Sequence, residues 1–506
     1  MTILRRSAIS IVANIVKGGL GFITGMLLAR GLGPEQYGIF AFLLASFSAL
    51  RLLLDMGTSN AFFTFISKRE RTKNFFNYYI LWLVVQFSLS VVFITILAPD
   101  DWLKAIWQGE SRDRVFIAFF AVFLQQQIWN MIAQVGESQR LTYKVQVMNV
   151  AIAFIHIILV VGLLLSDTIS IERVYYLIII EFLVAIIVAY LIFPITYAPG
   201  QDKFKNVSYE YWIYCLPLIP YTIFGMMSNF ADTWLLQYFG GAVEQAYFSV
   251  ALQFANISMI ATASVLRILW KEVAEANAKN DKEKLELIYE HTNRVLFMIG
   301  VIVSCFFIPW STEVILLLLG DEYLDGALTL TLMFFVPPFL ALSQVNSTMF
   351  YALELIKPFV IITTIQHIIM IITAYLFLAT PDAFIPGLGL GSTGLALNYL
   401  LLGIINVNFS IWWLSQKQGW KYYFSYQLLG IGIFLPLGIL VYYVINMLFF
   451  DSGYLLVRGI VAGILYVSIS GVIIYRVPSI IGIEREKMDD YVEKLVRIRL
   501  NKYFGS

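Results

Sequence analysis

Residues 7–42 of this 506-residue chain read SAISIVANIVKGGLGFITGMLLARGLGPEQYGIFAF. Two apolar segments meet in this stretch: the first covers residues 7–29, and the second covers residues 38–66. A transmembrane helix needs about 20 predominantly apolar residues, so each segment is long enough to cross a bilayer. The connection LGPEQYG contains Gly and Pro, which favour turns. The stretch therefore predicts two membrane-spanning helices joined by a turn.

The composition of the whole chain agrees with this local pattern. Of all residues, 59% are hydrophobic and 13% are charged, whereas a soluble globular chain has about 45–50% apolar and about 25% charged residues. This excess excludes a soluble enzyme and a disordered protein, and the long apolar runs exclude a transmembrane β-barrel. The net charge of +1 argues against a nucleic-acid partner. We predict an all-α polytopic membrane protein.

Polar breaks divide the apolar sequence into about fourteen candidate transmembrane spans. After the first two, the spans cover residues 75–98, 114–135, 144–165, 173–194, 210–239, 242–268, 294–319, 327–352, 357–379, 388–413, 425–449 and 454–475. The segment 478–506 is predicted to be an amphipathic cytoplasmic tail, because its apolar residues fall on one helical face. A similar surface helix is expected at 280–294.

The distribution of basic residues predicts the orientation. With a cytoplasmic N-terminus and alternating connections, the outer side receives only Arg30, Lys104, Arg112, Arg114, Arg173 and Arg458, out of 34 Lys and Arg residues. The cytoplasmic side receives most of the others, including the cluster SKRERTK at 67–73. This asymmetry follows the positive-inside rule. Both termini are therefore predicted to be cytoplasmic.

An internal repeat predicts the domain organisation. LGPEQYGIFAF from Leu32 and GGAVEQAYFSVA from Gly240 both place Glu-Gln and then Tyr after a Gly-containing break. The offset of six spans makes the two units parallel repeats. We predict an N-terminal six-helix bundle at 1–197, a cytoplasmic linker at 198–209, a C-terminal six-helix bundle at 210–415 and two additional transmembrane helices at 416–477. Pro217 and Pro220 are expected to kink or break the seventh span.

Polar side chains inside the spans indicate where a ligand binds. A charged side chain at the bilayer centre costs about 2.5–3.5 kcal/mol, so such residues face a bundle interior or a wet cavity. Corresponding spans of the repeat, namely one, two, seven and eight, each carry one polar helical face. We predict that these faces line one central cavity. The candidate substrate-binding residues are Asn14, Lys17, Arg51, Asp55, Asn229, Asp232, Asn256 and Arg267.

Several of these residues have a structural alternative. Arg51 and Asp55 are four residues apart and could form a local ion pair, and Arg267 could reach the inner headgroups instead of a cavity. Glu181 is either protonated or paired with a neighbouring helix. The lone intramembrane histidines, His156 and His367, are interpreted as hydrogen-bonded packing residues. The run Gln125–Gln127 with Asn130 is interpreted as hydrogen bonding between helices.

The sequence contains no pattern typical of an enzyme. It has no GxxxxGK[ST] and no HExxH motif, and no GxSxG in a strand–turn–helix context. Asp100 and Asp101 are interpreted as a solvated turn in a short outer loop. Cys215 and Cys305 lie far apart within apolar runs, so neither a disulfide nor a metal site is expected. The sequence predicts no enzyme activity and no bound cofactor, and it leaves open coupling to an H⁺ or Na⁺ gradient.

The opening stretch 7–42 resembles the start of the Wzx-type polysaccharide and O-antigen flippases. These belong to the multidrug/oligosaccharidyl-lipid/polysaccharide (MOP) transporter superfamily. The resemblance rests on the small, polar first span and on the turn LGPEQYG, and it extends to Pro217, the Asp232 region and the turn GGAVEQAYFSVA. It implies two parallel MATE-like six-helix bundles plus two C-terminal helices. Fourteen spans are similar to the longer members, including the lipid II flippase branch.

The resemblance also implies a function. It implies a flippase that moves an undecaprenyl-diphosphate-linked oligosaccharide from the inner to the outer leaflet by alternating access, for cell-surface polysaccharide export. In the lipid II flippase branch, basic residues of spans one, two and eight line the cavity, and Lys17, Arg51 and Arg267 match them by span. Lysine binds phosphate as a point charge and arginine binds it bidentately.

The same resemblance implies partners and a location. The partners are the lipid-linked oligosaccharide and membrane lipids, with polysaccharide polymerase or export machinery as further candidates. The implied location is the bacterial plasma (inner) membrane. The alternative function is a multidrug or cation exporter of the same superfamily, which would need an acidic cavity built from Asp55, Glu181 and Asp232. A membrane enzyme of polysaccharide assembly is disfavoured by the short outer loops.

Overall fold

The structure is a computed structural model of the chain. It describes residues 3–193, 196–200, 202–279, 281–449, 455–482, 485–486 and 489. Within these ranges it describes only the backbone of residues 3–8, 258–268, 270, 271, 274 and 278. Most of the predicted tail at 478–506 lies outside the described residues, so its amphipathic helix stays a prediction.

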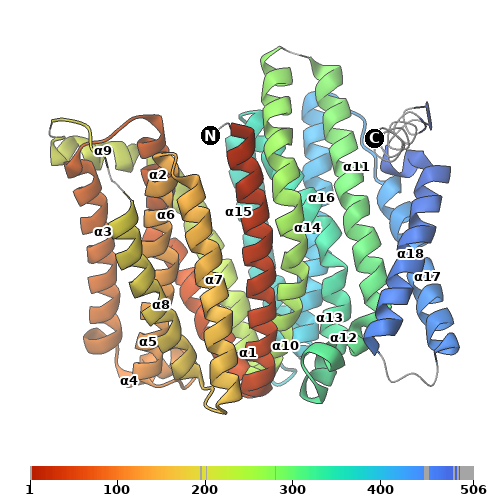
Figure 1. Cartoon of the computed structure of the whole chain (residues 1–506), viewed down its shortest axis with the longest axis horizontal. Helices are drawn as coiled ribbons and strands as arrows, with labels where there is room; N and C mark the ends of the chain where they lie inside the picture. Colours follow the sequence, from red (N-terminus) through yellow and green to blue (C-terminus); the bar gives the residue numbers. More distant parts are fainter. Residues whose placement is uncertain are drawn as a thin grey trace, which may run out of the picture. The chain divides into compact units, whose positions relative to one another are not determined.

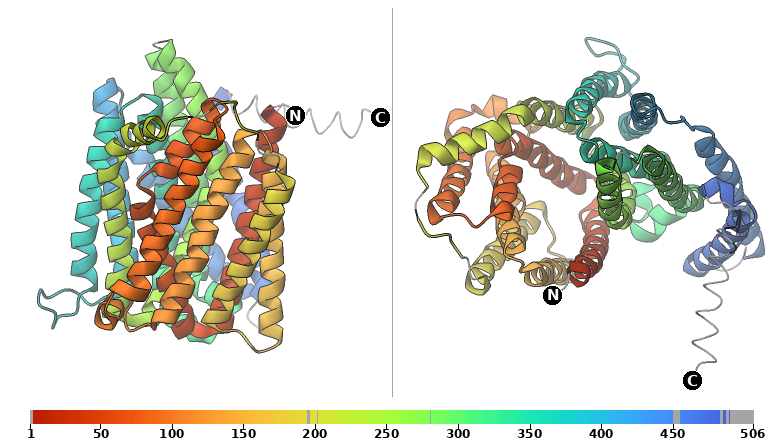
Figure 2. Two further views of the ribbon diagram at one scale, coloured as in Figure 1. Left: turned by 90° about the vertical axis from the view of Figure 1, so that its left-hand side faces the viewer. Right: turned by 90° about the horizontal axis from the view of Figure 1, so that it is seen from above.

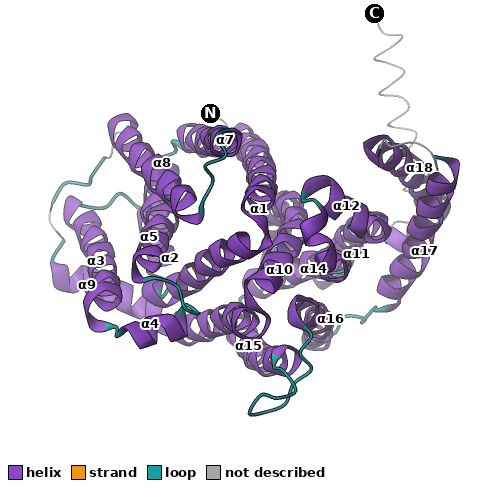
Figure 3. Cartoon of the chain, turned by 90° about the horizontal axis from the view of Figure 1, so that it is seen from below, coloured by secondary structure: helices purple, strands orange, loops and turns teal. Residues whose placement is uncertain are grey.

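The described part of the chain is built from helices and contains no strand, as Figure 3 shows. The α-helices are α1 (Ile3–Asp55), α2 (Thr58–Lys68), α3 (Lys73–Val92), α4 (Asp100–Ile106), α5 (Arg112–Phe123), α6 (Trp129–Ser138), α7 (Thr142–Leu165), α8 (Ile171–Ile192), α9 (Phe204–Cys215), α10 (Ile219–Ala278), α11 (Lys282–Phe307), α12 (Ser311–Leu318), α13 (Ala327–Phe334), α14 (Val336–Ala352), α15 (Ile356–Leu378), α16 (Gly391–Gln418), α17 (Ser425–Leu448) and α18 (Leu455–Arg476).

Short turns of other helix types join or extend these elements. Two are π-helical, at Phe93–Leu97 and Leu124–Ile128. The others are 3₁₀ turns, at Leu216–Leu218, Ile308–Trp310, Asp321–Gly326 and Pro478–Ile481. Pro217 lies inside the turn that separates α9 from α10. This confirms the predicted break in the seventh span, since proline cannot supply the backbone N–H of a helix interior.

The helices account for the predicted number of spans. Among the described residues, 12 helical segments are long and apolar enough to cross a membrane. Two of them, Ile9–Asp55 and Phe204–Ile257, are about twice the usual length. Each contains a glycine with non-helical backbone angles: Gly33 in α1 and Gly241 in α10. Each of these segments therefore holds two spans, which confirms the fold class of an all-α protein with about fourteen transmembrane helices.

The two copies of the sequence repeat have the same local structure. Gly33 has φ 71° and ψ 168°, and Gly241 has φ 79° and ψ −175°. These angles are accessible to glycine and strained for other residues. The two turns also contact each other: a Cβ atom added to Gly38 would lie 1.7 Å from the carbonyl oxygen of Ala242. Only glycine at position 38 permits this approach.

The chain divides into two compact units, each formed from two segments. One consists of Met1–Gln253 with Val360–Asn398, and the other of Phe254–Phe359 with Tyr399–Ser506. These units are defined by internal packing, whereas the predicted bundles were defined by the repeat. The predicted boundaries at 197, 209, 415 and 477 stay predictions.

In the first unit, α1 packs against α5 and α7, and α8 packs against α5 and α7. Figure 1 shows α5, α7 and α8 running side by side. Helix α9 differs in direction, because it runs crosswise next to the start of α3 (Figure 2). It contacts both α2 and α3. The segment before the seventh span is therefore a helix at the predicted cytoplasmic end of this unit rather than an extended linker.

In the second unit, α11 packs against α14 and α17, and α17 packs against α18. One cluster of buried side chains joins α17, α18 and the 3₁₀ turn that follows α11: Trp310, Val441, Ile445, Ala462 and Tyr466. Helix α11 begins at Lys282 and continues without a break to Phe307. The surface helix predicted at 280–294 is therefore the first part of the ninth span, because no glycine or proline separates the two.

Candidate substrate-binding site

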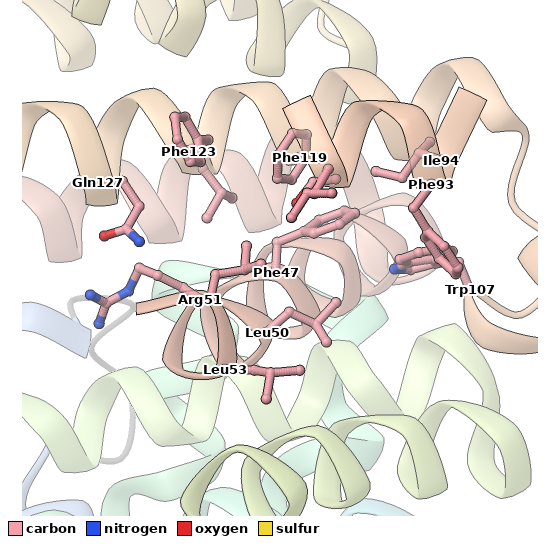
Figure 4. Close-up of a pocket in the computed structure, with 14 residues that line it drawn as sticks. Phe47, Leu50, Arg51, Leu53, Phe93, Ile94, Trp107, Phe119, Phe123 and Gln127 are labelled. Carbon is pink, nitrogen blue, oxygen red and sulfur yellow. The ribbon is translucent and has the colours of Figure 1, made fainter. Parts of the chain in front are cut away.

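Arg51 lies at one end of an apolar slot in the first unit. The slot has a volume of about 250 Å³ and is walled by α1, the end of α3, the π-helical turn Phe93–Leu97 and α5. Figure 4 shows Arg51 and Gln127 at one end and Phe93, Ile94 and Trp107 at the other. The slot therefore combines a cationic end with an aromatic and aliphatic body. Its remaining lining residues are Phe47, Leu50, Leu53, Leu54, Leu89, Ser90, Phe119, Val122 and Phe123.

The aromatic side chains of the slot hold one another in place. The rings of Phe47 and Trp107 stack with centroids 5.5 Å apart, and the ring of Phe47 meets that of Phe119 edge-on at 5.7 Å. Aromatic pairs at these separations are favourable beyond the area they bury. The body of the slot is therefore fixed by packing within the unit, and Leu89, at 63% exposure, lies at its open edge.

Arg51 does not form the local ion pair with Asp55 that the sequence allowed. The Asp55 carboxylate instead accepts hydrogen bonds from the Ser59 backbone N–H at 2.9 Å, the Ser59 hydroxyl at 2.9 Å and the Thr58 hydroxyl at 3.1 Å. These bonds cap the first turn of α2. The Nε of Arg51 is buried and has no hydrogen-bond acceptor among the described residues. Arg51 is therefore a half-buried guanidinium available to an anionic ligand.

Gln127 was not predicted as a site residue, although its hydrogen bonding was. Its side-chain nitrogen donates to Gln86 at 3.1 Å, and the nitrogen of Gln126 donates to Ser48 at 2.8 Å. This confirms the interpretation of the glutamine run as bonding between helices. The run lies on the π-helical turn Leu124–Ile128, and such turns occur often at functional sites. The polar run inside a span was the signal that could have suggested Gln127.

The remaining predicted residues of the first unit lie outside the slot. Asn14 and Lys17 are exposed on the first part of α1, and Lys17 has no ion pair among the described residues. On α10, Asn229 is exposed, whereas Asp232 is 2% exposed. None of the four lines the slot, and Asp55 does not line it either. Of the eight predicted residues, Arg51 is the one that the structure places in the slot among those whose side chains it describes.

Asn256 and Arg267 belong to the second unit. Asn256 is exposed on α10. Arg267 is also on α10, but its side chain lies outside the described residues. Both stay predicted binding residues, and the alternative that Arg267 reaches the headgroups stays open with them.

Glu181 has a partner on the neighbouring helix. The Nδ1 of His156 on α7 lies 2.8 Å from Oε2 of Glu181 on α8. Both side chains are largely buried, at 20% and 6% exposure, and Oε1 of Glu181 is buried without a hydrogen-bond partner. The two residues were considered separately in the sequence, because hydropathy does not show which helices are neighbours. The pairing confirms His156 as a hydrogen-bonded residue.

The fold and the site together define a class of protein. The chain has many membrane-spanning helices, two matching turns and an unpaired cation next to an apolar slot, which is the architecture of a membrane transporter. Comparison with protein families agrees. Residues 3–269 match the family described as polysaccharide biosynthesis protein, and residues 217–376 match the MatE family. The first match covers more than half of the chain, so the chain belongs to the polysaccharide biosynthesis protein family, within the MOP superfamily.

Individual relatives agree with this family. The chain is 21% identical over 329 residues to the probable low-salt glycan biosynthesis flippase Agl15 of Haloferax volcanii. The match spans 63% of this chain and 66% of the relative, just under two thirds of its length. The named relatives are flippases and transporters, in agreement with the prediction that the chain is not an enzyme.

Solved structures share the fold. The lipid II flippase MurJ in an inward closed conformation is 17% identical and superposes with a TM-score of 0.67, over 92% of this chain and 98% of that chain. An inward-facing multidrug resistance MATE family transporter of the MOP superfamily is also 17% identical, with a TM-score of 0.59 over 82% of this chain and 99% of that chain. These similarities confirm a two-bundle transporter fold.

Proposed function

We propose that this protein is a flippase that moves an undecaprenyl-diphosphate-linked oligosaccharide from the inner to the outer leaflet of the bacterial plasma membrane by alternating access. One observation carries the proposal: the half-buried guanidinium of Arg51, which has no partner among the described residues, lies at the end of an apolar slot. This pairing of charge and apolar surface suits an amphipathic anion, whose phosphate meets Arg51 while part of its lipid occupies the slot. A buried unpaired cation is costly unless a ligand uses it.

Membership of the polysaccharide biosynthesis protein family supports the same function. The relative in Haloferax volcanii is named as a probable glycan biosynthesis flippase, and the structural relative MurJ is named as a lipid II flippase. One name refers to a glycan and the other to lipid II. Lys17, exposed on α1, would attract the same diphosphate from the cytoplasmic side. Cytoplasmic termini and coupling to an H⁺ or Na⁺ gradient belong to the proposal, and polysaccharide polymerase or export machinery would receive the product.

A multidrug or cation exporter is the second candidate, and the MatE match at residues 217–376 favours it. That function needs an accessible carboxylate in the cavity. Asp55 is a poor choice, because both of its oxygens already accept hydrogen bonds from α2. Asp232, which is 2% exposed on α10, would have to serve.

A deletion strain distinguishes the two functions. If the protein is the flippase, deletion traps complete but unpolymerised lipid-linked repeat units in the inner leaflet. Wild type restores export, and Arg51→Ala at equal abundance does not. Absence of the trapped intermediate, together with altered sensitivity to cationic drugs that depends on Asp232, would instead support the exporter.

A further inference from the structure

A second and larger cavity lies in the first unit, at its predicted cytoplasmic end. It has a volume of about 870 Å³ and lies between α2, α3 and α9. Ligand pockets for small molecules typically measure about 300–1,000 Å³. We call this cavity the vestibule and define it by its six tyrosine and tryptophan residues: Tyr78, Tyr79, Trp82, Tyr209, Tyr211 and Trp212.

Part of the vestibule wall is fixed in position. The rings of Tyr79 and Tyr211 are nearly parallel, at 7°, with centroids 6.3 Å apart, and the ring of Tyr78 lies 5.3 Å from that of Tyr211. The indole N–H of Trp82 donates to the Thr58 hydroxyl at 3.1 Å. These contacts orient rings from α3 and α9 before any ligand binds. A preorganised wall reduces the entropy lost on binding.

The vestibule also contains polar groups that the protein leaves unused. Tyr211 is only 4% exposed, and its hydroxyl is buried without a hydrogen-bond partner. A buried polar group without a partner costs about 1–3 kcal/mol. The exposed ammonium of Lys205 also lines the vestibule and has no ion pair among the described residues. A ligand that brings hydroxyl groups and negative charge would satisfy both residues.

A belt of aromatic residues at the membrane surface explains only part of this arrangement. Tyr209 and Trp212 are 65% and 58% exposed, as residues of such belts are. The buried hydroxyl of Tyr211 does not belong to a belt, because belt residues place their polar ends in water. A saccharide fits better. The C–H groups of a pyranose face meet the negative faces of aromatic rings, and its hydroxyls pair with polar side chains.

The vestibule and the Arg51 slot are lined by consecutive parts of the chain. Residues of α1 up to Leu54 line the slot, and Met56 and Thr58 line the vestibule. The Thr58 hydroxyl donates to Asp55, which directly follows the slot residue Leu54, and accepts from Trp82 of the vestibule. A diphosphate links lipid and sugar in a lipid-linked glycan, so a group bound near Arg51 would place its sugar toward the vestibule.

We propose that the vestibule binds a pyranose of the lipid-linked glycan on the cytoplasmic side, and that its aromatic residues select for the sugar. The proposal rests on the proposed function, which supplies the class of substrate. Tyr78 and Trp212 stack on the sugar, in front of the buried rings of Tyr79 and Tyr211. The Tyr211 hydroxyl pairs with a sugar hydroxyl, and Lys205 attracts the diphosphate.

Site-directed photo-crosslinking tests this proposal. The full chain is purified and reconstituted in nanodiscs with Tyr209→p-benzoylphenylalanine, which places the reactive group at the vestibule edge. The probe is a radiolabelled polyprenyl diphosphate that carries one N-acetylhexosamine, and the comparison probe is the same polyprenyl diphosphate without the sugar. Tyr190→p-benzoylphenylalanine is the matched control, since Tyr190 is a 79% exposed residue of α8 in the same unit and does not line the vestibule.

We expect the glycosylated probe to label position 209 at least five-fold more than position 190, and more than the sugar-free probe does. Tyr211→Phe removes only a hydroxyl, and it should reduce this labelling about five-fold, which corresponds to one lost hydrogen bond. Trp212→Ala should reduce it at least as much, and Trp212→Phe should preserve most of it. Equal labelling at positions 209 and 190, or equal labelling by both probes, would show an ordinary lipid-facing surface and overturn the proposal.

Transport of the same probe separates this proposal from the proposed function. Arg51→Ala should stop translocation and should reduce, without abolishing, labelling at position 209, because the vestibule residues stay in place. Labelling without translocation by the wild type would contradict the flippase function and support the vestibule. Translocation without labelling at position 209 would overturn the vestibule alone.

Discussion

Two arginines of the first unit have opposite surroundings. Arg71, between α2 and α3, is 7% exposed and fully engaged: its Nη1 lies 2.9 Å from Glu210, and its Nε donates to the Phe65 carbonyl. Its guanidinium also packs over the rings of Phe65 and Phe75. Arg51 has an apolar slot on one side and a buried Nε without an acceptor. A buried arginine with all its partners stabilises the protein, whereas one without partners is available for a ligand.

The largest expected effect is on transport by Arg51→Ala. A hydrogen bond to a charged group contributes about 1.5–3 kcal/mol, so its loss should reduce transport roughly 10- to 100-fold. Arg51→Lys should retain part of the activity, because lysine keeps the charge without the bidentate geometry. The measurement is export per unit of membrane-inserted protein. Normal export by a well-expressed Arg51→Ala protein would remove Arg51 from the site.

Arg71→Ala should act on stability instead. It removes a buried cation and leaves Glu210, which is 38% exposed, without its closer partner, so we expect a loss of about 1–3 kcal/mol. Thermal unfolding of the purified protein measures this loss. Arg69→Ala is the matched control, because Arg69 is 67% exposed and reaches the same Glu210 at 3.7 Å. Such exposed pairs contribute about 0–1 kcal/mol, and equal effects of the two variants would contradict the distinction.

The same change at both positions sharpens the comparison. Arg51→Met replaces an unpartnered cation by an apolar side chain of similar length, so the unliganded protein should be as stable as wild type or more stable. Arg71→Met should be less stable than wild type, because it breaks the contact with Glu210. The readout is the thermal midpoint of both variants in one detergent. A clear loss of stability in Arg51→Met would show that Arg51 is structural.

The smallest expected effect on stability concerns a third arginine, Arg112. Arg112 donates to the carbonyls of Ile94 and Ala98 and, at 2.6 Å, to the carboxylate of Asp100, the first residue of α4. The hydrogen bond and charge of Arg112 lower the pKa of Asp100 below its ordinary value. A carboxyl whose folded pKa is lowered stabilises the fold above its ordinary pKa and loses this contribution as the pH falls through the folded value.

Asp100→Asn tests this small contribution. Asp100 is solvent-exposed, so solvent screens the interaction and the change in thermal midpoint should be small at neutral pH. The difference between wild type and variant should disappear in acid, where both side chains are uncharged. A difference that persists below the folded pKa would mean that Asp100 acts through hydrogen bonding alone.

The three arginines also show how far the sequence could predict this molecule. Helix positions followed from apolar length, and the doubled helices α1 and α10 followed from glycine-containing breaks. The partners of Arg71 could not be predicted from the sequence, because Glu210 lies 139 residues away in sequence. Arg71 was one of several basic residues in the cluster at 67–73, and its neighbours Phe65 and Phe75 were the only local sign of burial.

The candidate site was also only partly predictable from the sequence. Arg51 was identified because a charge inside a span is costly wherever it points. The role of Asp55 was not, since Arg51, Ser59 and Thr58 all lie within one turn of it, and only the structure shows which of them bind it. The vestibule was divided among the predicted third span, the linker and the seventh span. The aromatic run YEYWIYC at 209–215 resembled the start of a span, and the sequence does not show that it lies beside residues 78–82.

The segment that joins the two repeats has a mechanical consequence. The backbone N–H of Ala198 donates to the Arg71 carbonyl at 2.9 Å, and the Thr72 hydroxyl donates to Asp202 at 2.8 Å. With Arg71 and Glu210, these bonds anchor the segment to the ends of α2 and α3. The segment is therefore held in place by hydrogen bonds and is not a flexible linker. The 3₁₀ turn Leu216–Leu218 lies between this anchored segment and α10, so we expect any bending of α10 relative to the anchor to occur first at this turn.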